Sequence, residues 1–165
     1  MSTSRKFVES EFVPTQHSSA ADKAAFANHF VRFLESGFSQ KLFPDWFYRR
    51  LSMTFGHIAH YNREGFFATF FTTEEDKLEF LSQTLSYPCY GDPAYTYSDV
   101  EKALQDHIRR RGFVEIQRDA VAVETRNAEM ATLARLQEKY GQKTPAPKVD
   151  TVTKLLSSPQ QSLLF

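Results

Sequence analysis

The sequence predicts a mainly α-helical fold, with a compact helical domain followed by a disordered tether. Apolar residues recur at spacings of three and four over most of the chain, and residues that start and stop helices bracket these segments. After Gly141 the composition becomes polar and rich in lysine, serine and proline. We therefore expect an N-terminal arm at residues 1–18, a domain of about five helices at 19–141, with one short strand or hairpin as an option, and a flexible tail at 142–165.

The first two helices are expected to start near Ser19 and at Pro44. Ser19 and Asp22 have the spacing of a capping box, and Gly37 suits the end of this helix. Pro44 suits a first helical position, and the run 62–65 should end the second helix. The two apolar faces are Phe26, Phe30, Phe33 and Leu34, then Phe47, Leu51, Phe55 and Ile58.

Shorter segments are expected between residues 65 and 112. The run 65–71 favours a short helix with a buried strand close behind, because its phenylalanines do not alternate as in a half-buried strand. Capping boxes then mark helix starts at Thr73 and Ser98, and Gly112 suits the end of the second of these helices. Between them, residues 87–97 form a loop rich in tyrosine, which can contact a partner or close the core.

The longest periodic segment predicts one helix from about Glu115 to Tyr140, ending at Gly141. A strand at Phe113–Ile116 followed by a shorter helix is the alternative. The stripe that steps by three or four consists of Ile116, Ala120, Val123, Asn127, Met130, Leu133, Leu136 and Tyr140.

The bulk composition limits the classes of function. The 20 basic and 20 acidic residues give no net charge, so any contact with DNA requires a local patch or a partner. The single cysteine, Cys89, excludes an internal disulfide and fits a reducing cytosol. Without a signal peptide or a membrane-span-length apolar stretch, we expect a cytoplasmic protein that does not contact the membrane. The 16 phenylalanines favour some exposed aromatic surface for a partner.

The tail ends in the sequence Gln161-Ser162-Leu163-Leu164-Phe165. Apolar residues at the tip of a polar tether favour a docking peptide for a hydrophobic groove on another protein. The amide of Gln161 can both donate and accept hydrogen bonds at the rim of such a groove. Two alternatives are packing of this end against the chain's own domain and recognition by a protease as a degradation tag.

This pentapeptide resembles the bacterial sliding-clamp-binding motif, which is a glutamine, two looser positions and then Leu-Phe. The resemblance implies that Gln161 anchors the rim of a cleft on the β sliding clamp, that Leu164 and Phe165 fill its main pocket, and that Leu163 makes a secondary contact. The sequence departs from the family at Ser162, where leucine is preferred, and at Leu163, where serine or aspartate is frequent. The resemblance covers five residues and implies nothing about the helical domain.

Two other groups of side chains are candidates for chemistry. His57 and His60 lie at i, i+3 on a predicted helix, a spacing that can hold a metal, with Cys89 as a distant third ligand. Because a metal needs three or four converging ligands, we favour histidines that bond backbone carbonyls, and we predict no metal and no cofactor. We also identify no catalytic residue, since the sequence has no glycine-rich phosphate loop and no paired carboxylates.

Arginines form two basic clusters that can contact phosphate. The larger consists of Arg109, Arg110 and Arg111, with Arg118 nearby, and the smaller of residues 49–50. The larger cluster also falls in the last turn of a predicted helix, where cations stabilise the helix dipole, and we favour that role.

These patterns predict a non-enzymatic accessory protein that docks on the bacterial sliding clamp through its C-terminal peptide. It would act in DNA replication, DNA repair or a mobile element, with a second protein or DNA bound by the helical domain. One alternative is a phage- or plasmid-type inhibitor that binds a host complex through an aromatic-rich helical surface. Another is an enzyme or metal-binding protein centred on His57 and His60.

Overall fold

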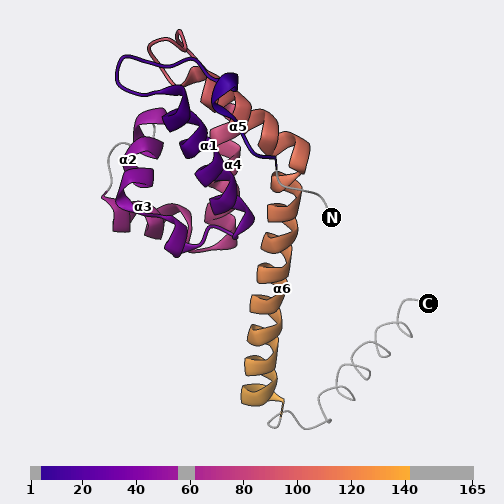
Figure 1. Ribbon diagram of the computed structural model, residues 1–165. Coiled ribbons are helices and arrows are strands. Elements are labelled where there is room, and N and C mark those ends of the chain that lie inside the picture. The colour runs from indigo at the N-terminus through magenta and orange to yellow at the C-terminus, as the bar shows by residue number, and fades with distance from the viewer. Residues whose placement is uncertain (1–4, 56–61, 142–165) are drawn as a thin grey trace, which may run out of the picture. The chain divides into compact units, whose positions relative to one another are not determined.

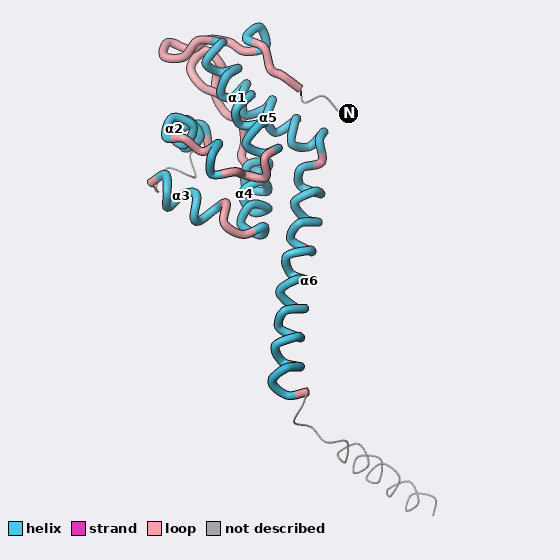
Figure 2. Tube along the Cα trace, turned by 60° about the horizontal axis from the view of Figure 1, so that its bottom comes forward, coloured by secondary structure: helices cyan, strands magenta, loops and turns pink. Residues whose placement is uncertain are grey.

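The structure is a computed structural model that describes residues 5–55 and 62–141 (Figure 1). The regular elements of these two ranges are all helical, as Figure 2 shows, so the predicted fold class is confirmed and the optional strand or hairpin is not found there. None of these helices has both the length and the apolar character that crossing a membrane requires. The elements are the 3-10 helices η1 (Glu9–Glu11) and η2 (Gln40–Leu42) and the α-helices α1 (Ala20–Glu35), α2 (Asp45–Thr54), α3 (Arg63–Phe70), α4 (Glu74–Ser86), α5 (Ser98–Arg111) and α6 (Phe113–Tyr140).

The chain divides into two compact units, Met1–Ala122 and Val123–Phe165. The boundary falls inside α6, whereas the sequence suggested a domain that ends at Gly141. The difference has a simple cause, because the α6 side chains that follow Val121 are exposed and take no part in a core.

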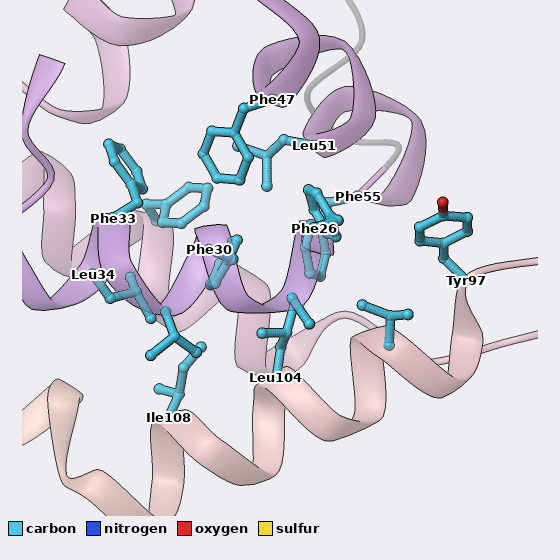
Figure 3. Packing of buried hydrophobic residues seen from close by; sticks show 14 of the residues in the cluster. Phe26, Phe30, Phe33, Leu34, Phe47, Leu51, Phe55, Tyr97, Leu104 and Ile108 are labelled. Carbon is cyan, nitrogen blue, oxygen red and sulfur yellow. The ribbon is translucent and has the colours of Figure 1, made fainter. Parts of the chain in front are cut away.

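Helix α1 forms the centre of the core of the first unit. Its predicted capping box is present: the Ser19 hydroxyl accepts a hydrogen bond from the amide of Asp22 at 3.0 Å, and the Asp22 carboxylate accepts one from the amide of Ser19 at 3.0 Å. Helices α2 and α5 both pack against α1. Figure 3 shows side chains of all three helices meeting in one apolar cluster, among them Phe26, Phe30, Phe33, Phe47, Leu51, Leu104 and Ile108.

Most of the 16 phenylalanines belong to this core. Rings from different elements meet edge to face, with centroid distances of 5.0 Å for Phe33 and Phe71 and 4.9 Å for Phe71 and Phe80. Pairs of this kind contribute about 0.5–1.5 kcal/mol each beyond the area that they bury. The phenylalanines in the described ranges therefore mainly form the core. They do not supply the exposed aromatic surface that the composition suggested.

The predicted N-terminal arm is part of the same core. Phe7 and Phe12 are buried, at 1% and 6% exposure. The side chain of Asn28 on α1 holds the backbone of Phe7 twice, accepting from its amide at 2.7 Å and donating to its carbonyl at 2.9 Å. Residue 18 is therefore not a boundary between an arm and a domain.

The end of α1 uses two consecutive residues with positive φ. Gly37, the predicted stop, has φ 73°, and Phe38 has φ 62°. This conformation costs a non-glycine residue on the order of 1 kcal/mol. The Phe38 ring is buried between Phe33 and Phe71, both with centroids 5.4 Å away, and this burial offsets the backbone strain.

Helix α3 begins where the sequence suggested that the second helix ends. Asn62 is its N-cap, and its side-chain oxygen accepts a hydrogen bond from the amide of Gly65 at 2.6 Å. Asparagine is found at both ends of helices, and here its side-chain hydrogen bond to the amide of Gly65 stabilises the start of α3. Helix α2 ends at Thr54, and its predicted stripe residue Ile58 lies outside the described residues.

The two later predicted capping boxes have different outcomes. Thr73 caps α4 by accepting from the amide of Asp76 at 3.1 Å, as expected. At α5 the N-cap is Tyr97, and the hydroxyl of Ser98 donates instead to the carbonyl of Gly91 at 2.9 Å. A hydrogen bond to the preceding loop thus replaces the predicted local cap.

Helix α6 starts at Phe113, so the alternative strand at Phe113–Ile116 is wrong and the long predicted helix is confirmed. Phe113 and Val114 pack against the core. The buried amide of Gln117 donates to the backbone carbonyl of Glu74 at 2.8 Å and to its carboxylate at 2.6 Å. These contacts tie the first turns of α6 to α4.

Lys23 is a fully buried lysine that joins α1 to the loop 87–97 and to α5. Its ammonium donates to the carbonyls of Pro93 and Thr96, at 2.9 and 3.0 Å, and to the carboxylate of Asp99 at 2.9 Å. The three acceptors match the three protons of the ammonium group. Nothing in the helical pattern of the sequence distinguishes this lysine from a surface residue.

We expect Lys23→Ala to lower the free energy of unfolding by about 3 kcal/mol or more, because it leaves a largely buried carboxylate and two carbonyls without their shared donor. Urea denaturation is the measurement, with Lys102→Ala, which removes an exposed lysine of α5, as the control. Equal stabilities of the two variants would contradict the role assigned to Lys23.

Candidate interaction surfaces

The docking residues predicted from the sequence, Gln161, Leu163, Leu164 and Phe165, lie outside the described residues and remain a prediction. The same holds for His57 and His60. Within residues 5–55 and 62–141, no group of three or more potential metal-binding side chains gathers.

In the described part of the second unit, residues 123–141, large apolar side chains are exposed on α6. Val123, Met130, Leu133 and Leu136 have exposures of 58%, 57%, 47% and 39%. Large apolar side chains exposed at helical spacing are typical of a face that binds another helix or a groove. We call these four residues, with Asn127 between them, the α6 face.

The α6 face belongs to the stripe predicted from the sequence, but the side chains of α6 that the structure buries are others. The face that packs on the first unit's core carries Phe113, Val114 and Gln117. Ile116, the first residue of the predicted stripe, is 59% exposed. Hydrophobic periodicity therefore identified the helix and its apolar face without identifying what that face contacts.

A hollow of about 360 Å³ on the first unit brings together residues from four segments. The Arg50 guanidinium lies 4.3 Å from the centroid of the Tyr97 ring and donates to the hydroxyl of Ser18 at 3.3 Å. Trp46, half exposed, forms another wall of the hollow. Tryptophan, tyrosine and arginine are the residue types that dominate binding energy at protein interfaces.

The indole of Trp46 is held in place from behind by His29. The two rings meet edge to face with centroids 4.7 Å apart, and His29 Nε2 lies 2.7 Å from the carbonyl oxygen of Leu42. Burial lowers the pKa of His29, and the nearby Arg32 lowers it further, against the raising effect of the hydrogen bond to Leu42. A neutral imidazole that donates from Nε2 fits this environment and gives the Trp46 side chain a rigid support.

The tyrosine loop closes the core, which is one of the two roles expected for it, and leaves two of its tyrosines exposed. Tyr97 is buried and Tyr87 packs on the core, whereas Tyr90 and Tyr95 are 79% and 80% exposed. The loop thus closes one end of the core and also presents two phenolic side chains at the surface.

The arginines predicted as phosphate contacts occupy the last turn of α5, where they complement the helix dipole. Arg109 also donates to the carbonyl of Leu85 at 3.3 Å and lies 3.7 Å from the Asp106 carboxylate. Consecutive helical residues point about 100° apart, so Arg109, Arg110 and Arg111 leave the helix in different directions, and contact of these residues with phosphate remains a prediction. Of the second pair, Arg49 is bonded to Asp45 at 2.7 Å and Arg50 takes part in the hollow.

Cys89, which is partly buried, and Glu101, which is buried, form an acidic pair that the sequence did not indicate. Burial raises the pKa of the Cys89 thiol, and the neighbouring Glu101 raises it further, so the thiol stays protonated and is a poor nucleophile. Burial also raises the pKa of Glu101 to about 7, and the nearby Asp99 raises it while the hydrogen bond from Cys89 lowers it. Glu101 stands in the first turn of α5.

The free energy of unfolding should therefore depend on the protonation of Glu101. A carboxyl whose pKa is raised on folding binds its proton more tightly in the folded state, so its stabilising contribution is complete below pH 4.5 and is lost as the pH rises to about 7. The quantity to compare is the free energy of unfolding of Glu101→Gln minus that of the wild type. We expect this difference to be about 1–3 kcal/mol more favourable to the variant at pH 8 than at pH 4.5.

Urea denaturation at the two pH values is the measurement. Asp106→Asn, which removes a partly exposed carboxylate of the same helix, is the matched control. A difference between Glu101→Gln and the wild type that is equal at both pH values would show that Glu101 titrates normally.

The described residues thus provide two surfaces suited to protein contacts, the α6 face and the hollow beside Trp46. Their two internal polar clusters have other roles. The contacts of Lys23 join α1 to the loop 87–97 and to α5, and the carboxyl of Glu101 has a raised pKa. The chain matches no protein-family model, and no curated protein and no solved structure matches it.

Proposed function

We propose that this protein is a non-enzymatic accessory protein that docks on the bacterial DNA sliding clamp through the peptide Gln161–Phe165. It would act in DNA replication, in DNA repair or in a mobile element. The observation that carries the proposal is the sequence Gln-Ser-Leu-Leu-Phe, which has the glutamine and the Leu-Phe pair of the clamp-binding motif at their required spacing.

The chemistry of these residues supports a cleft as the binding site. Leu164 and Phe165 offer two adjacent large apolar side chains, which gain free energy by leaving water for a hydrophobic pocket. Gln161 supplies an amide that donates and accepts at the rim. A short peptide that orders on binding loses conformational entropy, so an affinity on the order of micromolar is expected.

A neutral chain also fits recruitment by a clamp better than direct binding to DNA. The net charge is zero, and the arginines of α5 do not converge on one site. The clamp already encircles DNA, so a protein tethered to it reaches DNA-bound partners at a high effective concentration without a basic surface of its own. Competition with a polymerase for the same cleft is a second consequence of such docking.

We expect the double substitution Leu164→Ala and Phe165→Ala to weaken clamp binding at least about tenfold, because it removes both pocket-filling side chains. The matched control is Leu155→Ala with Leu156→Ala, which removes two adjacent leucines of the same segment outside the motif. Isothermal titration calorimetry with purified bacterial clamp measures both, and circular dichroism checks that the helical content is unchanged.

The two double variants have to differ. Loss of binding in both, or clamp binding by neither variant nor the wild type, would contradict the assignment of the clamp as partner.

A second candidate function is inhibition of a host complex by a phage- or plasmid-type protein that binds through its helical surface. The hollow favours it, because Trp46, Arg50 and Tyr97 meet there. Trp46→Ala should then abolish partner capture, whereas Met53→Ala, which removes another exposed side chain of α2, should not. Deletion of Gln161–Phe165 separates the two functions, since this second one survives it.

A further inference from the structure

The part of α6 from Val123 to Tyr140 is exposed along its length. Isolated helices of roughly this length are marginally stable in water, and most helices of proteins depend on packing of an apolar face. The α6 face, with side chains 39–58% exposed, offers such a surface. We propose that this segment pairs with the same segment of a second copy of the chain, antiparallel, with the twofold axis near Thr132.

The spacing of residues along this part of α6 fits a helix pair. Positions alternate by four and three in the manner of a coiled-coil seam. They are Val123, Asn127 and Met130 of the α6 face, followed by Ala134 and Gln137, which lie beside it. The seam mixes large, small and amide side chains, so its pairing is favourable only in a register that matches them.

An antiparallel register centred on Thr132 makes this match. Met130 of one copy lies opposite Ala134 of the other, which sets a large side chain against a small one. Asn127 lies opposite Gln137, and the two amides can each donate to and accept from the other. The twofold axis repeats every contact, so the seam contains two contacts of each kind.

The positions beside the seam support the same register. Leu133 faces Leu133 of the second copy, and Ala131 faces Ala131 on the other side of the seam. The leucines extend the apolar contact, and the small alanines allow the two backbones to approach closely.

Charge favours the antiparallel direction over the parallel one. The first half of the segment carries Glu124, Arg126 and Glu129, an excess of one negative charge, and the second half carries Arg135, Glu138 and Lys139, an excess of one positive charge. Antiparallel pairing sets unlike halves and opposed helix dipoles against each other. Parallel pairing would set like halves together and place Leu133 beside Glu138.

One pair of like charges remains in the proposed register, since Glu124 of one copy lies near Glu138 of the other. This gives a directional prediction: Glu138→Lys replaces two repulsive contacts by two attractive ones and should strengthen dimerisation about three- to tenfold. Met130→Glu should weaken it at least about tenfold by placing a charge in the seam. Sedimentation equilibrium of the full chain measures both dissociation constants.

Disulfide trapping tests the register. In a Cys89→Ser background, Ala131→Cys should form a covalent dimer on mild oxidation, whereas Thr125→Cys, on the opposite side of α6, should not. Asn127→Cys alone should form none, but a mixture of Asn127→Cys and Gln137→Cys chains should. Trapping of Asn127→Cys with itself would overturn the antiparallel register.

The proposal as a whole fails if the wild-type chain sediments as a monomer at up to roughly 100 μM, about a hundred times a micromolar dissociation constant. Coverage of the α6 face by residues 142–165, or by an unrelated partner, would give that result. The inference is independent of the clamp, because each variant leaves Gln161–Phe165 intact.

Discussion

Burial of the phenylalanine face of α1 is the constraint on which the rest of the first unit depends. Phe26, Phe30 and Phe33 are almost fully covered, and helices α2 and α5 both pack against α1 to cover them. The N-terminal segment is included in the same core, since Asn28 of α1 holds the backbone of Phe7 with two hydrogen bonds. Even the strained backbone at Phe38 follows from this demand, because its ring fills the space between Phe33 and Phe71.

The few ionisable groups inside this apolar unit are found where segments meet. Lys23 is satisfied by three oxygens from the loop 87–97 and α5, so its burial fixes the position of that loop. Glu101 has no equivalent cation among the residues that the structure describes, and burial raises its pKa to about 7. The loop and the start of α5 therefore contain both a contact with every proton bonded, at Lys23, and a group whose protonation depends on pH, at Glu101.

Only some of the candidate surfaces for partners were predictable. The stripe on α6 was visible as a helical period, and the Leu-Phe pair of the tail, which remains a prediction, was visible as a motif. The hollow beside Trp46 was not, because Ser18, the α2 residues Trp46 and Arg50, and Tyr97 come from three separate segments that only the packing of α1, α2 and α5 brings together. Likewise, three consecutive arginines suggested a phosphate site, but the helical rotation at the end of α5 points them in different directions.

The sequence by itself determined the helices, since periodic apolar residues and the caps at Ser19, Thr73 and Gly112 act within one turn of chain. Tertiary structure decided which apolar faces were buried, why Ser98 bonds to Gly91 in place of capping α5, and where the first unit ends. The physical reason is the range of the interactions: a cap or a helical period is local, whereas burial depends on which distant segment covers a side chain. For this reason the same stripe of α6 could be identified from the sequence as apolar, yet only the structure showed it exposed.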